Sequence, residues 1–121
     1  MEEHPAPFSV EEYKKMFASS PVMQSPRVKL LKFQFAQPEY KISAPAMAKA
    51  MGYKTFSAAN LQYGSFARDL ADSMGWTSRL GDACFFYVLS WYYELNGKDR
   101  SYGVWQLHEE VVLALQELGW K

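Results

Sequence analysis

Five side chains in the middle of the chain have the chemistry needed to contact nucleic acid. Asn60 and Gln62 carry amides, which can form paired hydrogen bonds with adenine. Lys54, Thr55 and Ser57 are of the types that commonly hold phosphate groups. The alternative is that Asn60 caps or packs inside the protein and that Gln62 is simply exposed. The sequence therefore allows two interpretations: these residues read DNA bases, or they have only a structural role.

Further basic residues can contact a phosphate backbone: Lys41, Lys49 and Arg68, and the pair Lys98 and Arg100. The chain has zero net charge, yet residues 14–54 hold eight basic residues and one acidic residue, a charge of +7. A block of one sign attracts phosphate even on a neutral protein. The alternative is a solvated face of scattered lysines. The neutral total favours that alternative, since DNA-binding domains are usually basic overall.

A short helix is predicted just before the polar segment. Ser43 has the position of an N-cap, Pro45 falls in the first turn, and Gly52 follows the last helical residue. These are the residue types that commonly begin and end helices. The helix is therefore about two turns long and is followed by a turn at residues 53–55.

A longer helix is predicted next, from about Phe56 to Met74, with Gly75 as its stop. Its buried stripe comprises Ala59, Tyr63, Ala67, Leu70 and Met74. Gly64 inside this helix costs about 1 kcal/mol relative to Ala, which indicates a closely packed neighbour. The two helices span residues 43–76 and have the proportions of a helix-turn-helix.

Two helices are predicted upstream, after a flexible segment at residues 1–8. Ser9 and Glu12 have the spacing of a capping box, and Phe8 and Tyr13 that of a hydrophobic staple, so a helix should run from about Val10 to Ala18. Ser25 followed by Pro26 predicts an N-cap and a second helix that ends before Pro38.

The last third of the chain predicts a β-hairpin and a closing helix. Residues 85–107 form the hairpin, with an aromatic first arm, an Asn96-Gly97 turn and a returning arm. Residues 109–118 form the helix, with Val111, Val112, Leu115 and Leu118 on its buried side. This order of elements predicts one small, mostly helical α+β domain over residues 1–121. The domain is winged-helix-like, and the hairpin is its wing.

The chain also resembles a known family. The resemblance is carried by residues 42–53 (ISAPAMAKAMGY), residues 58–64 (AANLQYG), Gly75-Trp76 and the ending Leu118-Gly119-Trp120. It covers roughly residues 25–121, and it is to a small, uncharacterised bacterial domain that occurs alone and fused to HNH-type restriction endonucleases. The resemblance implies a module that places a nuclease on DNA, in a restriction or phage-defence setting. The chain itself shows no nuclease part.

A protein-interaction module is the alternative function. Aromatic residues are dense in the hairpin: Phe85, Phe86, Tyr87, Trp91, Tyr92, Tyr93, Tyr102 and Trp105. Alternation places most such residues in a core, although aromatics can also stack an unpaired base. An excess of aromatic residues on both faces of a hairpin indicates that one face contacts a partner. In this alternative the hairpin and the C-terminal helix bind another protein or a second copy of the chain.

Enzymatic and membrane functions are not favoured. Cys84 and His108 have no family-specific string around them, and a buried inert thiol is the simpler interpretation of Cys84. The two histidines, His4 and His108, are too few and too separated for a zinc site with Cys84. A glycine-rich phosphate loop and a membrane-length apolar run are also missing. We therefore expect a cytoplasmic, non-catalytic protein without metal or cofactor.

Overall fold

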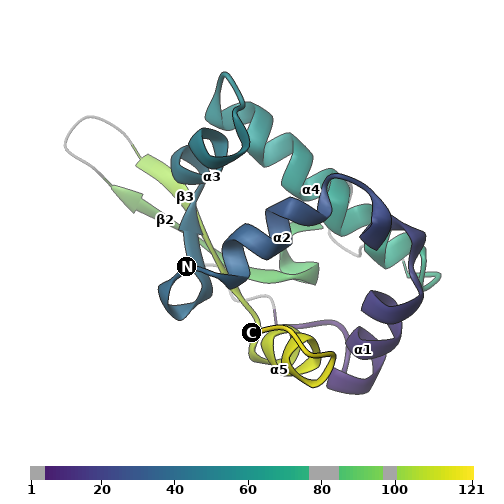
Figure 1. Ribbon diagram of the computed structural model, residues 1–121. Coiled ribbons are helices and arrows are strands. Elements are labelled where there is room, and N and C mark those ends of the chain that lie inside the picture. The colour runs from purple at the N-terminus through teal and green to yellow at the C-terminus, as the bar shows by residue number, and fades with distance from the viewer. Residues whose placement is uncertain (1–4, 77–84, 97–100) are drawn as a thin grey trace.

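The computed structural model describes residues 5–76, 85–96 and 101–121. Within these ranges the protein is α+β, with five α-helices and one three-stranded antiparallel sheet (Figure 1). The elements are α1 (Val10–Ser19), α2 (Val28–Phe35), β1 (Lys41–Ser43), α3 (Ala44–Met51), α4 (Phe56–Asp72), β2 (Ser90–Asn96), β3 (Ser101–Leu107) and α5 (Glu109–Glu117), with 3-10 helices η1 (Pro21–Gln24), η2 (Pro38–Tyr40) and η3 (Phe85–Val88). None of the described helices is both long and apolar enough to cross a lipid bilayer.

The sheet joins the middle of the chain to its C-terminal part. The strand order is β1-β3-β2, so β3 is the central strand. β1 pairs with β3 from Lys41 opposite Gln106 to Ser43 opposite Val104, and β2 pairs along the whole of β3. The sequence does not predict β1, because three residues are too few to show an alternating pattern.

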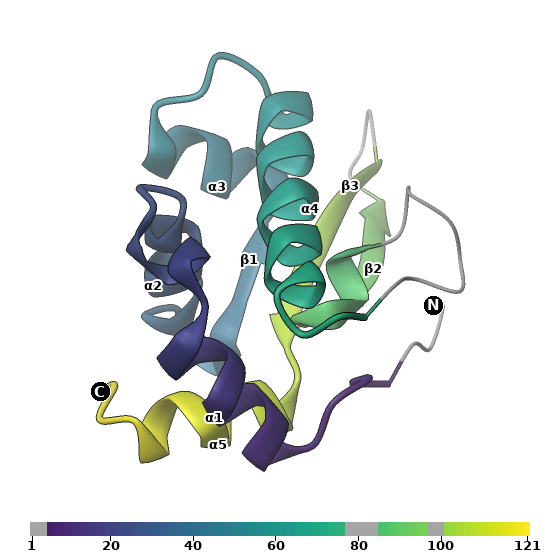
Figure 2. The ribbon, with the colours of Figure 1, turned by 90° about the vertical axis from the view of Figure 1, so that its right-hand side faces the viewer.

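Helices cover one side of the sheet and close one end of the molecule. α2, α3 and α4 lie on one side of the sheet, and α1 lies beside α5 (Figure 2). The ring of Tyr63 on α4 stacks on the indole of Trp105 on β3, with 4.3 Å between ring centroids. Both side chains are fully buried, so this pair fixes α4 against the central strand.

Three polar side chains form a closed hydrogen-bond ring in the core. The Tyr63 hydroxyl lies 2.6 Å from both Gln34 Oε1 and Ser90 Oγ, and Gln34 Nε2 donates to Ser90 Oγ at 3.1 Å. Gln34 Oε1 can only accept, so Tyr63 donates to it and the Ser90 hydroxyl donates to Tyr63. All three residues are buried, and burial raises the pKa of Tyr63, which keeps the phenol neutral. The ring ties α2, α4 and β2 together.

The predicted caps of two helices are confirmed. Ser9 and Glu12 form the capping box of α1, and Ser43 caps α3. Gly52 ends α3 with φ of +75°, a left-handed conformation that glycine adopts without strain. These signals are local, which is why the sequence predicts them well.

Two predicted boundaries in the N-terminal part are wrong. α2 begins at Val28 rather than directly after Ser25, because residues 26 and 27 form a turn. The Ser25 hydroxyl has no hydrogen-bond partner within the described ranges. Phe8, expected in a flexible segment, is buried, and its ring meets Tyr13 and Trp76 edge-on. The hydrophobic staple therefore extends the ordered structure to Phe8.

Two predicted boundaries in the C-terminal part are also wrong. The first arm of the hairpin does not begin at residue 85, because Phe85–Val88 is the 3-10 helix η3 and β2 begins at Ser90. A high density of aromatic residues does not by itself distinguish a strand from a 3-10 helix. Leu118, expected on the buried side of α5, is 38% exposed. It follows the last helical residue, where the chain turns at Gly119 with φ of +97°.

His108 is buried where β3 meets α5. Its Nε2 lies 2.6 Å from the carbonyl oxygen of Tyr87, so Nε2 carries the proton and donates it. Nδ1 is buried without a hydrogen-bond partner among the described residues. Burial lowers the pKa of His108, because a charged imidazolium is poorly solvated there.

We expect His108 to make the folded state acid-sensitive. The pKa of histidine is about 6.5 in the unfolded chain and lower in the folded protein, so only the unfolded state gains this proton as the pH falls below about 6.5. The free energy of unfolding should then fall by up to about 1.4 kcal/mol per pH unit from this residue. Urea unfolding of the native chain and of His108→Gln between pH 7.5 and about pH 5 tests this. Equal pH slopes in the two proteins would contradict it.

Candidate nucleic-acid interface

The turn between α3 and α4 is fixed at both ends. Gly52 ends α3, and the Thr55 hydroxyl caps α4 by accepting a hydrogen bond from the Ala58 amide at 3.2 Å. Lys54 and Thr55 are both exposed in this turn. The helix pair predicted for this region is therefore present, and its turn places Lys54 beside the positive N-terminal end of α4.

α4 turns one side to the core and the other to solvent. Its core side consists of residues with no exposed surface: Ala59, Tyr63, Phe66, Ala67, Leu70 and Ala71. At about 100° per residue, Ser57, Leu61 and Arg68 lie within about 40° of one another on the opposite side. All three are exposed. We call these three residues the outward face of α4.

The two predicted base-reading amides lie on different flanks of α4. Asn60 and Gln62 are half-buried, and side chains two residues apart project about 200° from each other around a helix. Neither side chain has a hydrogen-bond partner among the described residues. Asn60 therefore caps no described residue, although its half-buried side chain agrees with the packing part of the alternative interpretation, and Gln62 is half-buried rather than fully exposed. The two amides cannot reach one base pair together.

The predicted lysines divide into two groups. Lys49 on α3 and Lys54 in the turn are exposed, and neither forms an ion pair with a described residue. Lys41 lies at the start of β1, away from α3, and its Nζ is 3.3 Å from the Glu39 carboxylate. This hydrogen bond to Glu39 raises the pKa of Lys41. Lys41 therefore does not join the other two at the turn.

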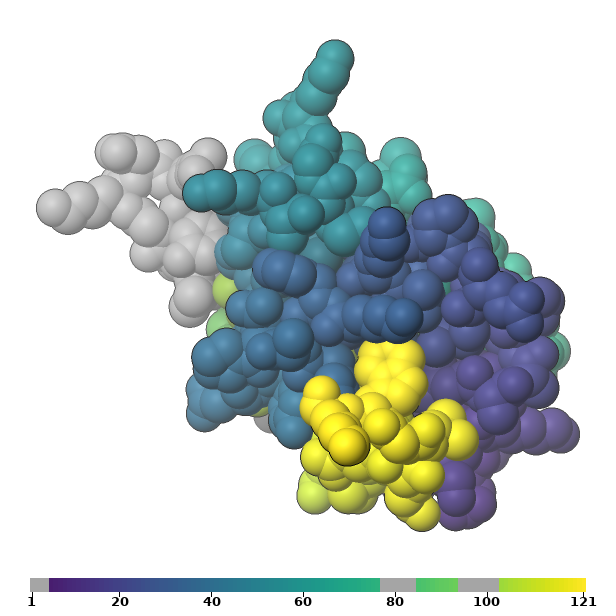
Figure 3. All heavy atoms as spheres, in the orientation of Figure 1, coloured from purple at the N-terminus to yellow at the C-terminus, as the bar shows by residue number. Residues whose placement is uncertain are grey.

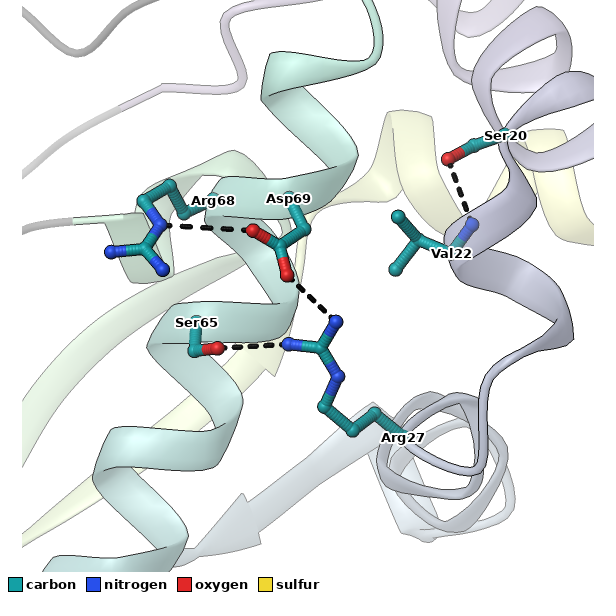
Figure 4. Close-up of polar contacts among 6 residues, drawn as sticks. All are labelled: Ser20, Val22, Arg27, Ser65, Arg68 and Asp69. Carbon is teal, nitrogen blue, oxygen red and sulfur yellow. Dashed lines mark hydrogen bonds and ion pairs between the residues drawn. The ribbon is translucent and has the colours of Figure 1, made fainter.

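Arg68 shares a carboxylate with a second arginine (Figure 4). Arg27 holds Asp69 at 2.7 Å and donates to the Ser65 hydroxyl at 2.8 Å, which joins the segment before α2 to α4. Arg68 approaches the other oxygen of Asp69 through Nε at 3.7 Å. Two guanidinium groups thus face one carboxylate, and this group of three keeps a net positive charge.

Charge is separated between the two ends of the molecule. Residues 40–68 contain four basic residues and no acidic residue. We call this stretch the basic segment; it includes α3, the turn and most of α4. α1 and α5 together contain five glutamates and two lysines. The turn and α3 lie at one end of the molecule and α5 at the other (Figure 3).

A groove of about 490 Å³ runs along α4 beside η3. It is lined by Asn60, Leu61, Gln62, Gly64, Ser65, Arg68, Phe85 and Phe86. A Cβ atom at Gly64 would lie 3.4 Å from the ring of Phe86, so this glycine does face a packed neighbour. Phe86 in turn stacks on Tyr92, with 5.4 Å between ring centroids. The groove thus has an aromatic wall opposite the side of α4 that carries Asn60, Leu61 and Gln62.

Sequence reasoning missed the most exposed apolar side chain in the basic segment. Leu61 is 69% exposed on the outward face, and Phe56 at the start of α4 is 40% exposed. The signal was present, because Leu61 does not fall on the buried stripe of the helix. An off-stripe leucine in a helix otherwise patterned for burial indicates an exposed apolar position.

Some predicted residues lie outside the described ranges. These are His4, Cys84, Lys98 and Arg100. Within the described ranges, no group of three or more His, Cys, Asp or Glu side chains is arranged to hold a metal ion. The geometry that bears on function is therefore that of the basic segment and the adjoining groove.

Comparisons with known proteins add no further assignment. No family model matches the chain, and neither a curated protein nor a solved structure matches it at the significance threshold. The function is therefore argued from the geometry above.

Proposed function

We propose that the protein is a DNA-binding module of winged-helix type, with α4 as the helix that enters the major groove. The observation that carries this proposal is the charge separation. The basic segment itself contributes no carboxylate. Glu39 and Asp69, directly outside it, face Lys41 and Arg68, whereas Lys49 and Lys54 are exposed and form no ion pair with a described residue. A neutral protein can present such an end to a phosphate backbone while its acidic end faces away.

The order of the elements supports the winged-helix part of the proposal. A winged-helix domain runs helix, strand, helix, helix, strand, strand, and its sheet has the first strand beside the third. Here α2, β1, α3, α4, β2 and β3 follow in that order, and the strand order is β1-β3-β2. The end of β2 and the start of β3, which lie far from α5, are at the same end of the molecule as the α3–α4 turn (Figures 1 and 2).

Different residues take different parts in the proposed complex. Lys49 and Lys54 hold phosphates on either side of the groove, and the Thr55 and Ser57 hydroxyls add hydrogen bonds. The outward face of α4 meets the base edges, since an α-helix fits the major groove. Asn60 and Gln62 lie on the two flanks of this face, and both line the η3 groove. Lys41 contributes less, because the exposed Glu39 carboxylate competes with phosphate for its ammonium group.

Binding of the native chain to a fluorescent random-sequence duplex tests the proposal. We expect a Kd of about 10⁻⁴ to 10⁻⁶ M near physiological salt, and affinity that falls steeply between about 50 mM and about 200 mM salt. No binding at the lower salt concentration by folded protein would contradict the proposal. It would favour the protein-interaction alternative, for which Leu113 and Leu118 are exposed at 41% and 38% near the C-terminus.

The link to HNH-type nucleases and to restriction or phage defence stays a prediction that rests on the resemblance alone. A DNA-binding module without catalytic residues is what such a link requires. Preference for DNA over another nucleic acid is part of the same proposal, since the major groove of RNA is too narrow for side chains to read.

A further inference from the structure

Leu61 occupies the centre of the outward face of α4. Ser57 lies one turn before it and Arg68 two turns after it, and Leu61 also lines the groove that contains Phe85 and Phe86. With 69% of its surface exposed, Leu61 contributes little to the core. A single exposed leucine is common on protein surfaces and needs no explanation by itself. On the face proposed to contact DNA, however, this leucine would present an apolar group to the base edges.

The floor of the major groove displays one apolar group. This group is the 5-methyl of thymine, and a methylated cytosine carries a methyl at the same ring position. An apolar side chain aimed at the floor gains free energy only where such a methyl is present, while a bare C–H edge offers it nothing. Asn60, adjacent to Leu61, has the amide that pairs with adenine, the partner of thymine.

We propose that Leu61 reads the 5-methyl groups of pyrimidines in the major groove. The inference rests on the proposed function and adds the chemical feature that α4 selects. A methylated pyrimidine suits this surface better than a protein partner does. The outward face offers one apolar side chain between Ser57 and Arg68. Lys49 and Lys54 of the basic segment are exposed and form no ion pair with a described residue, which matches a phosphate-bearing partner.

Replacing thymine by uracil tests the inference without changing the protein. A tight-binding duplex is first enriched from a random-sequence library, then resynthesised with deoxyuridine at every thymine, so that only the methyl groups are lost. We expect about fourfold weaker binding for each methyl that Leu61 contacts. A second pair of duplexes, with cytosine or 5-methylcytosine in the same sequence, shows whether methylated cytosine is also read.

Two leucine variants show whether the discrimination belongs to Leu61. Leu61→Ala should bind the thymine and uracil duplexes equally, whereas Leu113→Ala, which alters an exposed leucine on α5, should keep the native preference. Equal binding of the native chain to both duplexes, and to both cytosine forms, would overturn the inference while leaving DNA binding intact. If neither duplex binds, the proposed function fails, and the inference fails with it.

Discussion

Replacing both Lys49 and Lys54 by alanine should weaken DNA binding more than any other pair of lysine substitutions. Each lysine is exposed and without an ion pair among the described residues, so each is free to displace a counterion from the DNA backbone. We expect the slope of log affinity against log salt concentration to become less steep by about two, and affinity near 0.1 M salt to fall on the order of tenfold. Anisotropy titrations at several salt concentrations measure both quantities.

A matched double variant separates this local effect from a change in total charge. Lys15 on α1 and Lys121 at the end of the chain are also exposed, and Lys15→Ala with Lys121→Ala removes the same two charges away from the basic segment. We expect it to keep nearly the native salt slope. If the slope of log affinity against log salt concentration becomes less steep by the same amount in both double variants, the lysines act through total charge. The basic segment is then not the binding surface.

Replacing Tyr63 by phenylalanine should destabilise the fold by about 1–3 kcal/mol. The substitution keeps the ring that stacks on Trp105 and removes only the hydroxyl. Gln34 Oε1 then loses its hydrogen-bond donor in a site with no exposed surface, and Ser90 loses an acceptor. An unsatisfied buried polar atom retains the full cost of its desolvation. Urea unfolding of the native and variant proteins measures the difference.

Tyr53→Phe is the matched control for this substitution. Tyr53 is half-buried, and its hydroxyl has no hydrogen-bond partner among the described residues. We expect a change in the free energy of unfolding within about 0.5 kcal/mol. Equal effects of Tyr63→Phe and Tyr53→Phe would mean that the closed ring of Gln34, Tyr63 and Ser90 contributes no specific stability.

The sequence predicts the features of this fold that depend on neighbouring residues. The caps at Ser9 and Ser43 and the stop at Gly52 are present as expected, because each is set within one helical turn. The buried stripe of α4 follows from its helical period for the same reason, except at Met74, which is half-buried and lies beyond the end of the helix at Asp72. The short β1 and the 3-10 helix η3 are not predicted, because their conformation is imposed by tertiary contacts.

The candidate interface could be predicted only in part, because ion pairs join distant residues. The sequence identifies Lys49 and Lys54, but it does not show that Lys41 turns to Glu39. From the sequence alone, Arg27 also counts as a free basic residue, whereas in the structure it binds Asp69, 42 positions later. No local pattern carries such pairings. In contrast, the opposite flanks of Asn60 and Gln62 follow directly from helical geometry once α4 is accepted.

The most direct test of the central claim is to map where duplex DNA contacts the protein. Backbone amide resonances of the labelled 13.9 kDa chain can be followed while the duplex is added. We expect the largest shift changes on α3, the turn and the first half of α4, with α1 and α5 nearly unchanged. Shift changes concentrated on α1 and α5, or spread evenly over the surface, would contradict it.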